Sequence, residues 1–293
     1  MLKTLKHWLL ALRLKTLTAA VVPIVVGTAL TSAMGYPLHH WITICALLSS
    51  LFIQIGTNLI NDAMDFKKGA DTNERIGPTR ITQSGSATFQ SVLRMGLLFF
   101  FLAFLLGIPL AIKGGWPIIM IGILSLICGY AYTGGPFPLA YHGLGDLFVI
   151  LFFGVIATMG IIYLQTEEWC VESFVAGLQV GALATVLIAI NNFRDIKGDF
   201  NANKKTLAVR FGPRFVRYEI LSLIALTFFL NFYWWENGFK VPALLSLLSL
   251  PLGVIVVKNV MSQEPSPIYN KFLAQSALLH CIFGGLLSLG FAL

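Results

Sequence analysis

Two clusters of acidic and amide side chains, far apart in the chain, have the residue types and spacing of a metal-binding site. The first contains Asn61, Asp62 and Asp65, and the second contains Asp195 and Asp199. Carboxylate and amide oxygens suit Mg²⁺, which characteristically joins a few carboxylates to the phosphate oxygens of a substrate. The two clusters therefore predict a site for a divalent cation and a phosphorylated substrate.

In a helix, the polar residues of each cluster share one face. At about 100° per residue, the first stripe is about 100° wide, and its members are Gln54, Asn58, Asn61, Asp62 and Asp65. The second face holds Thr185, Asn192, Asp195 and Asp199. Downstream, Arg75-Ile-Gly77-Pro78-Thr-Arg80 resembles Arg210-Phe-Gly212-Pro213-Arg214. The similarity of the two regions predicts a pseudo-repeat in which helices one to four correspond to helices five to eight.

Positive charge accompanies both clusters. The basic residues nearby are Lys67, Lys68, Arg75, Arg80, Lys204, Lys205 and Arg210. Carboxylates flanked by cations are typical of a metal-bridged diphosphate site. The alternative is that the acids are helix caps paired with topogenic charges, but this does not explain two matched motifs.

The composition indicates that these elements lie in a membrane. The 293 residues are 57% apolar and 11% charged, whereas soluble domains carry about 25% charged residues. Nine apolar runs approach the roughly 20 residues that a spanning helix needs, and they are Leu17–Met34, Trp41–Ile60, Gly96–Ile112, Trp116–Tyr132, Leu147–Gln165, Ser173–Ile190, Ile220–Trp235, Val241–Val257 and Phe272–Leu293. We therefore expect an all-α polytopic membrane protein, with residues 1–293 forming a single bundle around a central cavity.

The basic residues predict the orientation. With a cytoplasmic N-terminus, all lysines and arginines except Lys113 and Lys240 fall in cytoplasmic segments, as the positive-inside rule requires. Nine spans then place the C-terminus on the opposite side of the cell (inner) membrane. The net charge of +7 thus reflects topology, and no nucleic-acid partner is expected. The first run is interpreted as a retained helix and not a cleaved signal peptide, because eight more apolar spans follow it.

At this point the motifs resemble those of the UbiA superfamily of intramembrane aromatic prenyltransferases. The pattern Asn61-Asp62-x-x-Asp65 matches the first aspartate-rich motif and Asp195-x-x-x-Asp199 the second. Further resemblances are Arg13-Leu-Lys15-Thr-Leu-Thr, Tyr132-Thr-Gly-Gly-Pro136 and Asn191-Asn192-x-Arg194-Asp195. Within the superfamily, the chain is most similar to members that prenylate 1,4-dihydroxy-2-naphthoate in menaquinone biosynthesis.

The resemblance implies a Mg²⁺-dependent transfer of a polyprenyl group from polyprenyl diphosphate to 1,4-dihydroxy-2-naphthoate, with loss of the carboxylate to give demethylmenaquinol. Asp62, Asp65, Asp195 and Asp199 are then the catalytic residues and metal ligands. Candidate diphosphate contacts are Lys67, Arg75, Arg80, Lys204 and Arg210, and candidate partners of the metal are Asn58, Asn61 and Asn192. Arg13 or Lys15 would hold the acceptor carboxylate, and one of Tyr130 and Tyr132 would line the cavity.

Three alternatives stay open at this stage. The acceptor of a related prenyltransferase would be 4-hydroxybenzoate, homogentisate or haem. Arg13 and Lys15 would otherwise be topogenic charges, and the two tyrosines membrane-interface anchors. A secondary transporter also places carboxylates in a repeated bundle, but nearer the middle of the membrane.

Overall fold

The computed structural model describes residues 7–8, 10–71 and 75–293. Lys3 and Lys6, two of the charges used to predict the orientation, lie outside the described residues. All the regular elements described are helices. Their order is η1 (Leu14–Thr16), α2 (Thr18–Ala33), α3 (His40–Lys67), α4 (Phe89–Ala131), η2 (Leu139–His142), α5 (Gly145–Ile150), η3 (Leu151–Ile156), α6 (Ala157–Thr166), α7 (Val171–Arg194), α8 (Ile196–Asn201), α9 (Leu207–Phe229), α10 (Asn231–Glu236), α11 (Lys240–Leu247), α12 (Leu250–Ser262) and α13 (Tyr269–Ala292).

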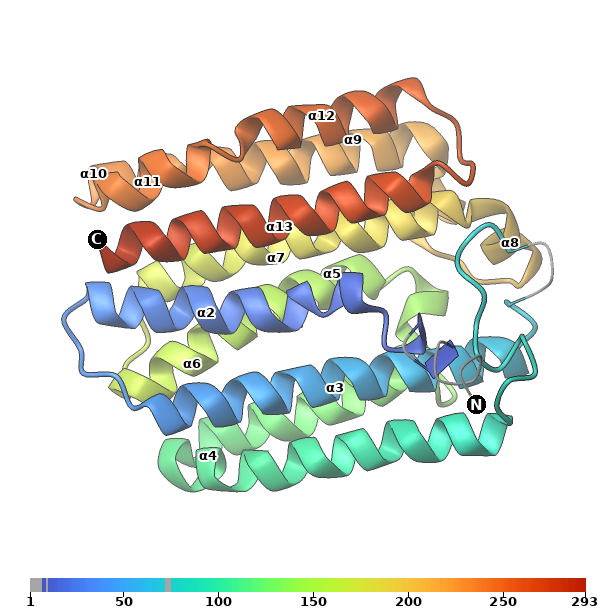
Figure 1. Ribbon diagram of the computed structural model, residues 1–293, viewed down its shortest axis with the longest axis horizontal. Coiled ribbons are helices and arrows are strands. Elements are labelled where there is room, and N and C mark those ends of the chain that lie inside the picture. The colour runs from blue at the N-terminus through green and yellow to red at the C-terminus, as the bar shows by residue number, and fades with distance from the viewer. Residues whose placement is uncertain (1–6, 9, 72–74) are drawn as a thin grey trace.

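The helices form one bundle, and its long members run roughly parallel or antiparallel (Figure 1). Seven helical segments in the described chain are long and apolar enough to cross a membrane, and the bent pair α11 and α12 makes an eighth. α4 is two helices joined at Gly115, where φ is +63°, and the chain turns back there (Figure 1). The expected nine spans therefore fit the structure, and the all-helical bundle is confirmed in the described residues.

α7 is the central helix, and 83% of its 18-residue apolar stretch is buried inside the bundle. Its neighbour η3 is one turn of π-helix inside the span formed by α5 and α6. A Cβ on Gly154 would lie 2.4 Å from the carbonyl oxygen of Gly177 and from the Cα of Gly181. The two backbones thus touch, as small residues allow in membrane bundles.

The polar elements gather at one end of the bundle. The end of α3, residues 75–88 and α8 lie together there, and the C-terminal end of α13 lies at the other (Figure 1). Both acidic clusters are therefore at the same end, although more than 120 residues separate them in the chain.

Candidate active site

Asp65 and Asp199 face each other across one ammonium group. Asp65 lies in the last turn of α3, Asp199 lies in α8, and their exposed fractions are 5% and 6%. The Nζ atom of Lys204 is 3.5 Å from Oδ2 of Asp65 and 3.6 Å from Oδ1 of Asp199. The fold thus brings the two acidic motifs to a common cation.

The electrostatics of this pair favour a further positive charge. Burial raises the pKa of Asp199 to about 6, despite the nearby ammonium of Lys204. Burial would lower the pKa of Lys204, but the carboxylates of Asp199 and Asp65 outweigh it and raise that pKa. Lys204 therefore stays charged, and the carboxylates are only partly neutralised.

Tyr141, in η2, completes the surroundings of Asp65. Its hydroxyl donates a hydrogen bond to Oδ1 of Asp65 over 2.9 Å. Nζ of Lys68 lies 4.4 Å from the Tyr141 ring centroid, and Nζ of Lys204 lies 5.6 Å from it. Burial, the charge of Asp65 and this hydrogen bond raise the pKa of Tyr141, so its hydroxyl remains a donor. The sequence analysis missed Tyr141, because no periodic pattern marks its short element.

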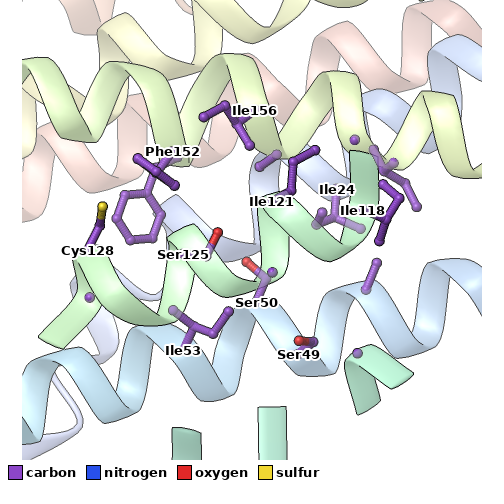
Figure 2. A pocket seen from close by; sticks show the side chains of 18 of the residues that line it. Ile24, Ser49, Ser50, Ile53, Ile118, Ile121, Ser125, Cys128, Phe152 and Ile156 are labelled. Carbon is purple, nitrogen blue, oxygen red and sulfur yellow. The ribbon is translucent and has the colours of Figure 1, made fainter. Parts of the chain in front are cut away.

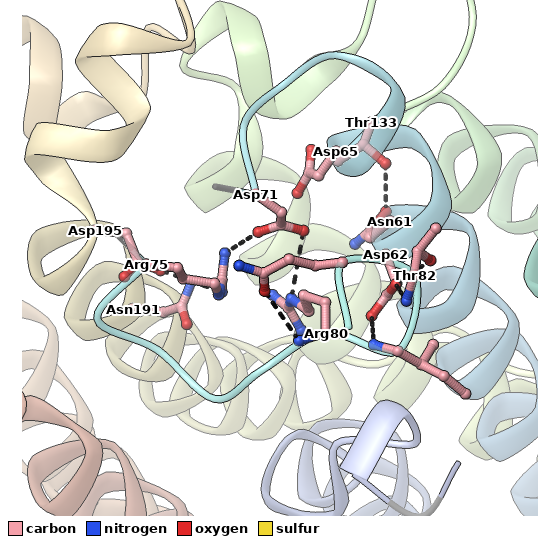
Figure 3. Close-up of polar contacts among 12 residues, drawn as sticks. Asn61, Asp62, Asp65, Asp71, Arg75, Arg80, Thr82, Thr133, Asn191 and Asp195 are labelled. Atoms are coloured by element: carbon pink, nitrogen blue, oxygen red, sulfur yellow. Dashed lines mark hydrogen bonds and ion pairs between the residues drawn. The ribbon is translucent and has the colours of Figure 1, made fainter. Parts of the chain in front are cut away.

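Arg75 joins Asp71, which follows the first motif, to Asp195 of the second motif. Its guanidinium forms an ion pair with Asp71 and donates from Nη2 to Oδ2 of Asp195 over 3.4 Å (Figure 3). Asp195 also accepts from Nε and Nη2 of Arg194, at 2.8 and 2.6 Å. Burial would raise the pKa of Asp195, but the hydrogen bonds from Arg194 and the charge of Arg75 lower it. Asp195 is therefore ionised and already neutralised by arginine.

Arg194 is a buried side chain with several hydrogen-bond partners, and the sequence analysis assigned it no role. Its side chain is 1% exposed, and its guanidinium also donates to Oδ1 of Asn191 and Oδ1 of Asn270. A Cβ on Gly77 would lie 2.6 Å from Nη2 of Arg194. Glycine is thus needed in the Arg75-x-Gly77-Pro78 motif so that the loop can approach this guanidinium.

Asp62 faces a loop and not the other carboxylates. Its side chain is fully buried and accepts hydrogen bonds from the backbone N–H groups of Ile81 and Thr82, at 3.3 and 3.1 Å, and from the Thr82 hydroxyl (Figure 3). In this arrangement Asp62 fixes the loop that carries Arg80. Its role as a metal ligand remains a prediction.

The three predicted asparagines are buried near the same end of the bundle. Asn58 donates to the carbonyl oxygen of Leu12 and to the hydroxyl of Thr16, both over 3.1 Å. Asn61 accepts from the Thr133 hydroxyl over 2.7 Å. Asn192 is 6% exposed. Asn58 and Asn61 thus join α3 to the N-terminal segment and to the loop after α4.

A cavity of about 380 Å³ opens beside these residues, and we call it the polar cavity because charged and amide side chains line part of its otherwise apolar wall. Arg13, Arg75 and Arg80 line it, and each has at least one buried guanidinium nitrogen without a hydrogen-bond partner among the described residues. Burial lowers the pKa of Arg13, and burial with the nearby charges of Arg13 and Arg75 lowers that of Arg80 to about 9. Three crowded cations with unused donors form a site suited to an anion.

An apolar cavity of about 180 Å³ adjoins the polar one. Ile53, Ile118, Ile121 and Phe152 line it, with Ser49, Ser50, Ser125 and Cys128 (Figure 2). Thr57, Tyr132, Val149 and Phe153 line both cavities, so they mark the junction. Tyr130 lines neither cavity and is 37% exposed. The structure thus places one of the two predicted tyrosines, Tyr132, in the cavity wall.

Three of the predicted contact residues have partners other than the aspartates. Nζ of Lys67 lies over the ring of Phe89, 5.6 Å from its centroid. Arg210 donates to the carbonyl oxygens of Lys205 and His142. Lys15 lines the polar cavity but donates to the carbonyl oxygen of Asn270 over 3.3 Å. Their assignment to substrate stays a prediction, and of the three only Lys15 lines a cavity.

The Asp65 and Asp199 pair fits Mg²⁺ by its donor chemistry. No group of three His, Cys, Asp or Glu side chains in the described part of the chain is placed to hold a metal. Magnesium usually takes one or two carboxylates from a protein and completes its shell with waters and substrate phosphates. Two buried carboxylates that already share one cation meet this requirement.

The raised pKa of Asp199 predicts a pH dependence for metal binding. Below about pH 6 this carboxyl holds a proton that must leave before it can ligate a cation. We expect the affinity for Mg²⁺ to fall by up to about tenfold per pH unit below pH 6 and to level off above it. Calorimetric titration of Mg²⁺ from pH 5 to pH 8 measures this. In Asp199→Asn the dependence should flatten; an unchanged pH profile would mean that another group titrates.

Comparison with known proteins identifies relatives over most of the chain. A family described as the UbiA prenyltransferase family matches residues 20–282. The 1,4-dihydroxy-2-naphthoate octaprenyltransferase of Bacillus subtilis is 32% identical over 282 residues, which cover 94% of this chain and 88% of that protein. The protein of the same name from Escherichia coli is 36% identical over 275 residues, covering 89% and 86%.

Solved structures share the fold. A UbiA homolog from Archaeoglobus fulgidus bound to DMAPP and Mg²⁺ has a TM-score of 0.67 at 19% identity, covering 96% of this chain and 99% of that chain. A UbiA homolog from Aeropyrum pernix K1 in its apo form has a TM-score of 0.70 at 16% identity, covering 94% and 96%. At these identities the likeness concerns the arrangement of helices.

Proposed function

The chain belongs to the UbiA prenyltransferase family, and from this premise we propose that it transfers a polyprenyl group from polyprenyl diphosphate to 1,4-dihydroxy-2-naphthoate, giving demethylmenaquinol for menaquinone biosynthesis. It is a multi-pass membrane prenyltransferase. The observation that carries the choice of acceptor is the 32% to 36% identity to four bacterial 1,4-dihydroxy-2-naphthoate octaprenyltransferases over 77% to 98% of the chain. The transporter alternative has no support among these relatives.

The diphosphate would bind between the two acidic motifs. Asp65 and Asp199 would hold Mg²⁺, which supplies charge to stabilise the departing diphosphate. Lys204, Arg75 and Lys68 surround this position and would contact phosphate oxygens directly. Asp195, which two arginines already neutralise, would act by holding Arg75 in place.

The two cavities would separate the two substrates. The apolar cavity suits an isoprenoid chain, and the polar cavity suits an acceptor that carries a carboxylate. Their junction at Tyr132 is where the allylic cation would form, and an aromatic ring face stabilises a cation. The surrounding apolar side chains exclude water, which would otherwise capture the cation.

The proposed reaction needs no base from the protein, because CO₂ leaves the ring in place of a proton. The bond between the allylic carbon and the diphosphate oxygen breaks, and the oxygen keeps the electron pair. The ring carbon that bears the carboxylate attacks the allylic carbon, and CO₂ then leaves. The electron pair of the broken carbon–carboxylate bond restores the aromatic ring. Arg13, with two buried unpartnered nitrogens among the described residues, is placed to hold the carboxylate until it leaves.

The enzyme would sit in the cell (inner) membrane with its acidic end facing the cytoplasm. Lys68, Arg75 and Lys204 contact Tyr141, Asp195, Asp65 and Asp199 at this end, which supports the orientation by the positive-inside rule. The N-terminus would then be cytoplasmic and the C-terminus on the opposite side. Prenyl diphosphate, which carries several negative charges, would reach the site from the cytoplasm.

Filling the apolar cavity should shorten the isoprenoid that the enzyme accepts. Gly122 lines this cavity, and a Cβ there meets no atom within 4 Å. The leucine side chain would occupy space that the longer isoprenoid needs, and overpacking costs about 1–3 kcal/mol. We therefore expect Gly122→Leu to lower kcat/KM for an octaprenyl diphosphate about tenfold relative to geranyl diphosphate. Gly285→Leu, at an exposed glycine of α13 with equally open space, is the control. Equal losses for both chain lengths would place the isoprenoid elsewhere.

The proposed function is tested with the purified protein in detergent or nanodiscs. The substrates are octaprenyl diphosphate and naphthoate labelled in its carboxyl group, with and without Mg²⁺. We expect Mg²⁺-dependent prenylation with stoichiometric release of labelled CO₂. Prenylation of 4-hydroxybenzoate or homogentisate alone would overturn the choice of acceptor but keep the reaction class. Absence of any prenylation would overturn both.

A further inference from the structure

Gln54 lines the polar cavity and carries a buried hydrogen-bond acceptor that no described residue uses. It lies in α3, lines the cavity and is 7% exposed. Its Oε1 atom is buried and has no hydrogen-bond partner among the residues that the structure describes. The residue belongs to the polar stripe of α3, yet nothing in the mechanism above uses it.

The neighbouring amides on the same helix face are all engaged. Asn58 donates to Leu12 and Thr16, and Asn61 accepts from Thr133. A buried acceptor left without a donor is costly, and an apolar side chain of the same size would avoid the cost. The carbonyl of Gln54 is therefore best explained by a donor that arrives with a ligand.

The other walls of the cavity define that ligand. Arg13 offers two buried guanidinium nitrogens without a hydrogen-bond partner in the described chain, and Nε of Arg80 has only an ion pair with Asp71 at 3.7 Å, so one end of the cavity suits an anionic group. The hydrogen bond from Asn58 to Leu12 fixes the segment that carries Arg13 against α3. Gln54 is one helical turn before Asn58, about 6 Å deeper along the axis. The cavity thus matches a compact molecule with a carboxylate at one end and a hydroxyl at the other.

We propose that Gln54 accepts a hydrogen bond from the ring hydroxyl of the aromatic acceptor that is remote from its carboxylate, and that it thereby positions the ring and selects for dihydroxy acceptors. This inference rests on the proposed function. In 1,4-dihydroxy-2-naphthoate, the hydroxyl adjacent to the carboxylate is occupied by an internal hydrogen bond. The 4-hydroxyl is free to donate, and the carboxylate lies toward Arg13.

Such a hydrogen bond makes the enzyme select against an acceptor analogue that lacks the 4-hydroxyl. A site built to bind a hydroxyl rejects a substrate without it strongly, because the protein acceptor is then buried unpaired. 1-Hydroxy-2-naphthoate keeps the carboxylate and its neighbouring hydroxyl but lacks the 4-hydroxyl. It is therefore the matched probe of Gln54.

The experiment compares the two naphthoates in wild type and Gln54→Met, at saturating polyprenyl diphosphate and Mg²⁺. We expect the substitution to lower kcat/KM for the dihydroxy acceptor by about 10- to 100-fold and to leave that for the monohydroxy acceptor unchanged or higher. Intrinsic reactivities cancel when the wild-type ratio is divided by the variant ratio. The KM for prenyl diphosphate should not change.

A stability measurement separates positioning from a structural role. Gln54→Met removes an unpaired acceptor, so the melting temperature should stay the same or rise. Gln179→Met is the control, because the Gln179 amide bonds Thr227, Asn231 and Trp234. It should lower the melting temperature and leave the acceptor ratio, which is kcat/KM for the dihydroxy naphthoate divided by that for the monohydroxy naphthoate, unchanged.

Two results would overturn the inference alone. One is an equal loss for both naphthoates, and the other is a Gln54→Met protein that is destabilised with an unchanged acceptor ratio. If the wild-type enzyme prenylates neither naphthoate, the proposed function fails as well, and the two failures are distinguishable.

Discussion

Replacing Asp65 or Asp199 by asparagine is expected to reduce kcat/KM for prenyl transfer by about 10²- to 10³-fold or more. Each substitution removes one of the two carboxylates that converge on Nζ of Lys204 from separate motifs. Removing a single group that stabilises developing charge in an enzyme site costs about this much. Initial rates measured over a range of Mg²⁺ concentrations should show a weaker metal dependence in both variants.

Glu264→Gln is the matched control for the loss of a carboxylate. Glu264 is an exposed acid whose side chain pairs with Arg217, outside both cavities. Its replacement should leave the rate and the Mg²⁺ dependence near the wild-type values. Wild-type turnover in Asp65→Asn and Asp199→Asn would contradict the assignment of the site.

Replacing Arg194 by methionine is expected to destabilise the protein by about 3–5 kcal/mol. The Arg194 side chain is 1% exposed and donates two hydrogen bonds to Asp195. Its removal leaves one buried carboxylate with only the longer contact to Arg75, and breaking a buried pair costs this much. Unfolding in mixed detergent micelles, followed by circular dichroism, measures the change.

Glu264→Gln tests whether the effect of Arg194 comes from burial. Glu264 also forms an ion pair, with Arg217, but the Glu264 side chain is 77% exposed. An exposed pair contributes about 0–1 kcal/mol, so this variant should unfold close to the wild type. Similar midpoints for the Arg194 and Glu264 variants would show that the bonds to Asp195 add no stability.

The fold was predictable because its signal is local. A membrane span is a continuous apolar run, and each run can be recognised without knowing its neighbours. The break between Ile112 and Trp116 was expected, and the structure places it at Gly115. The π-helical turn at Leu151–Ile156 was not predictable, because it arises where the backbone of Gly154 meets Gly177 and Gly181.

The sequence predicted many of the residues that form the site, but not which of them contact each other. Periodicity placed Asp62 and Asp65 on the inner face of α3, and both are buried. It did not show that Asp62 faces the loop at Ile81 and Thr82 while Asp65 faces Lys204. Those partners come from distant segments, so only the packed bundle determines them. Arg194 was missed because a lone arginine at a helix end looks like a topogenic charge.

The most direct test of the central claim is a structure with Mn²⁺ in place of Mg²⁺ and an unreactive thio analogue of prenyl diphosphate. Anomalous scattering then locates the metal. We predict a peak within about 2.3 Å of carboxylate oxygens of both Asp65 and Asp199, with the analogue's phosphates on its other side. A metal peak remote from these two residues, or a diphosphate bound without metal, would contradict the account.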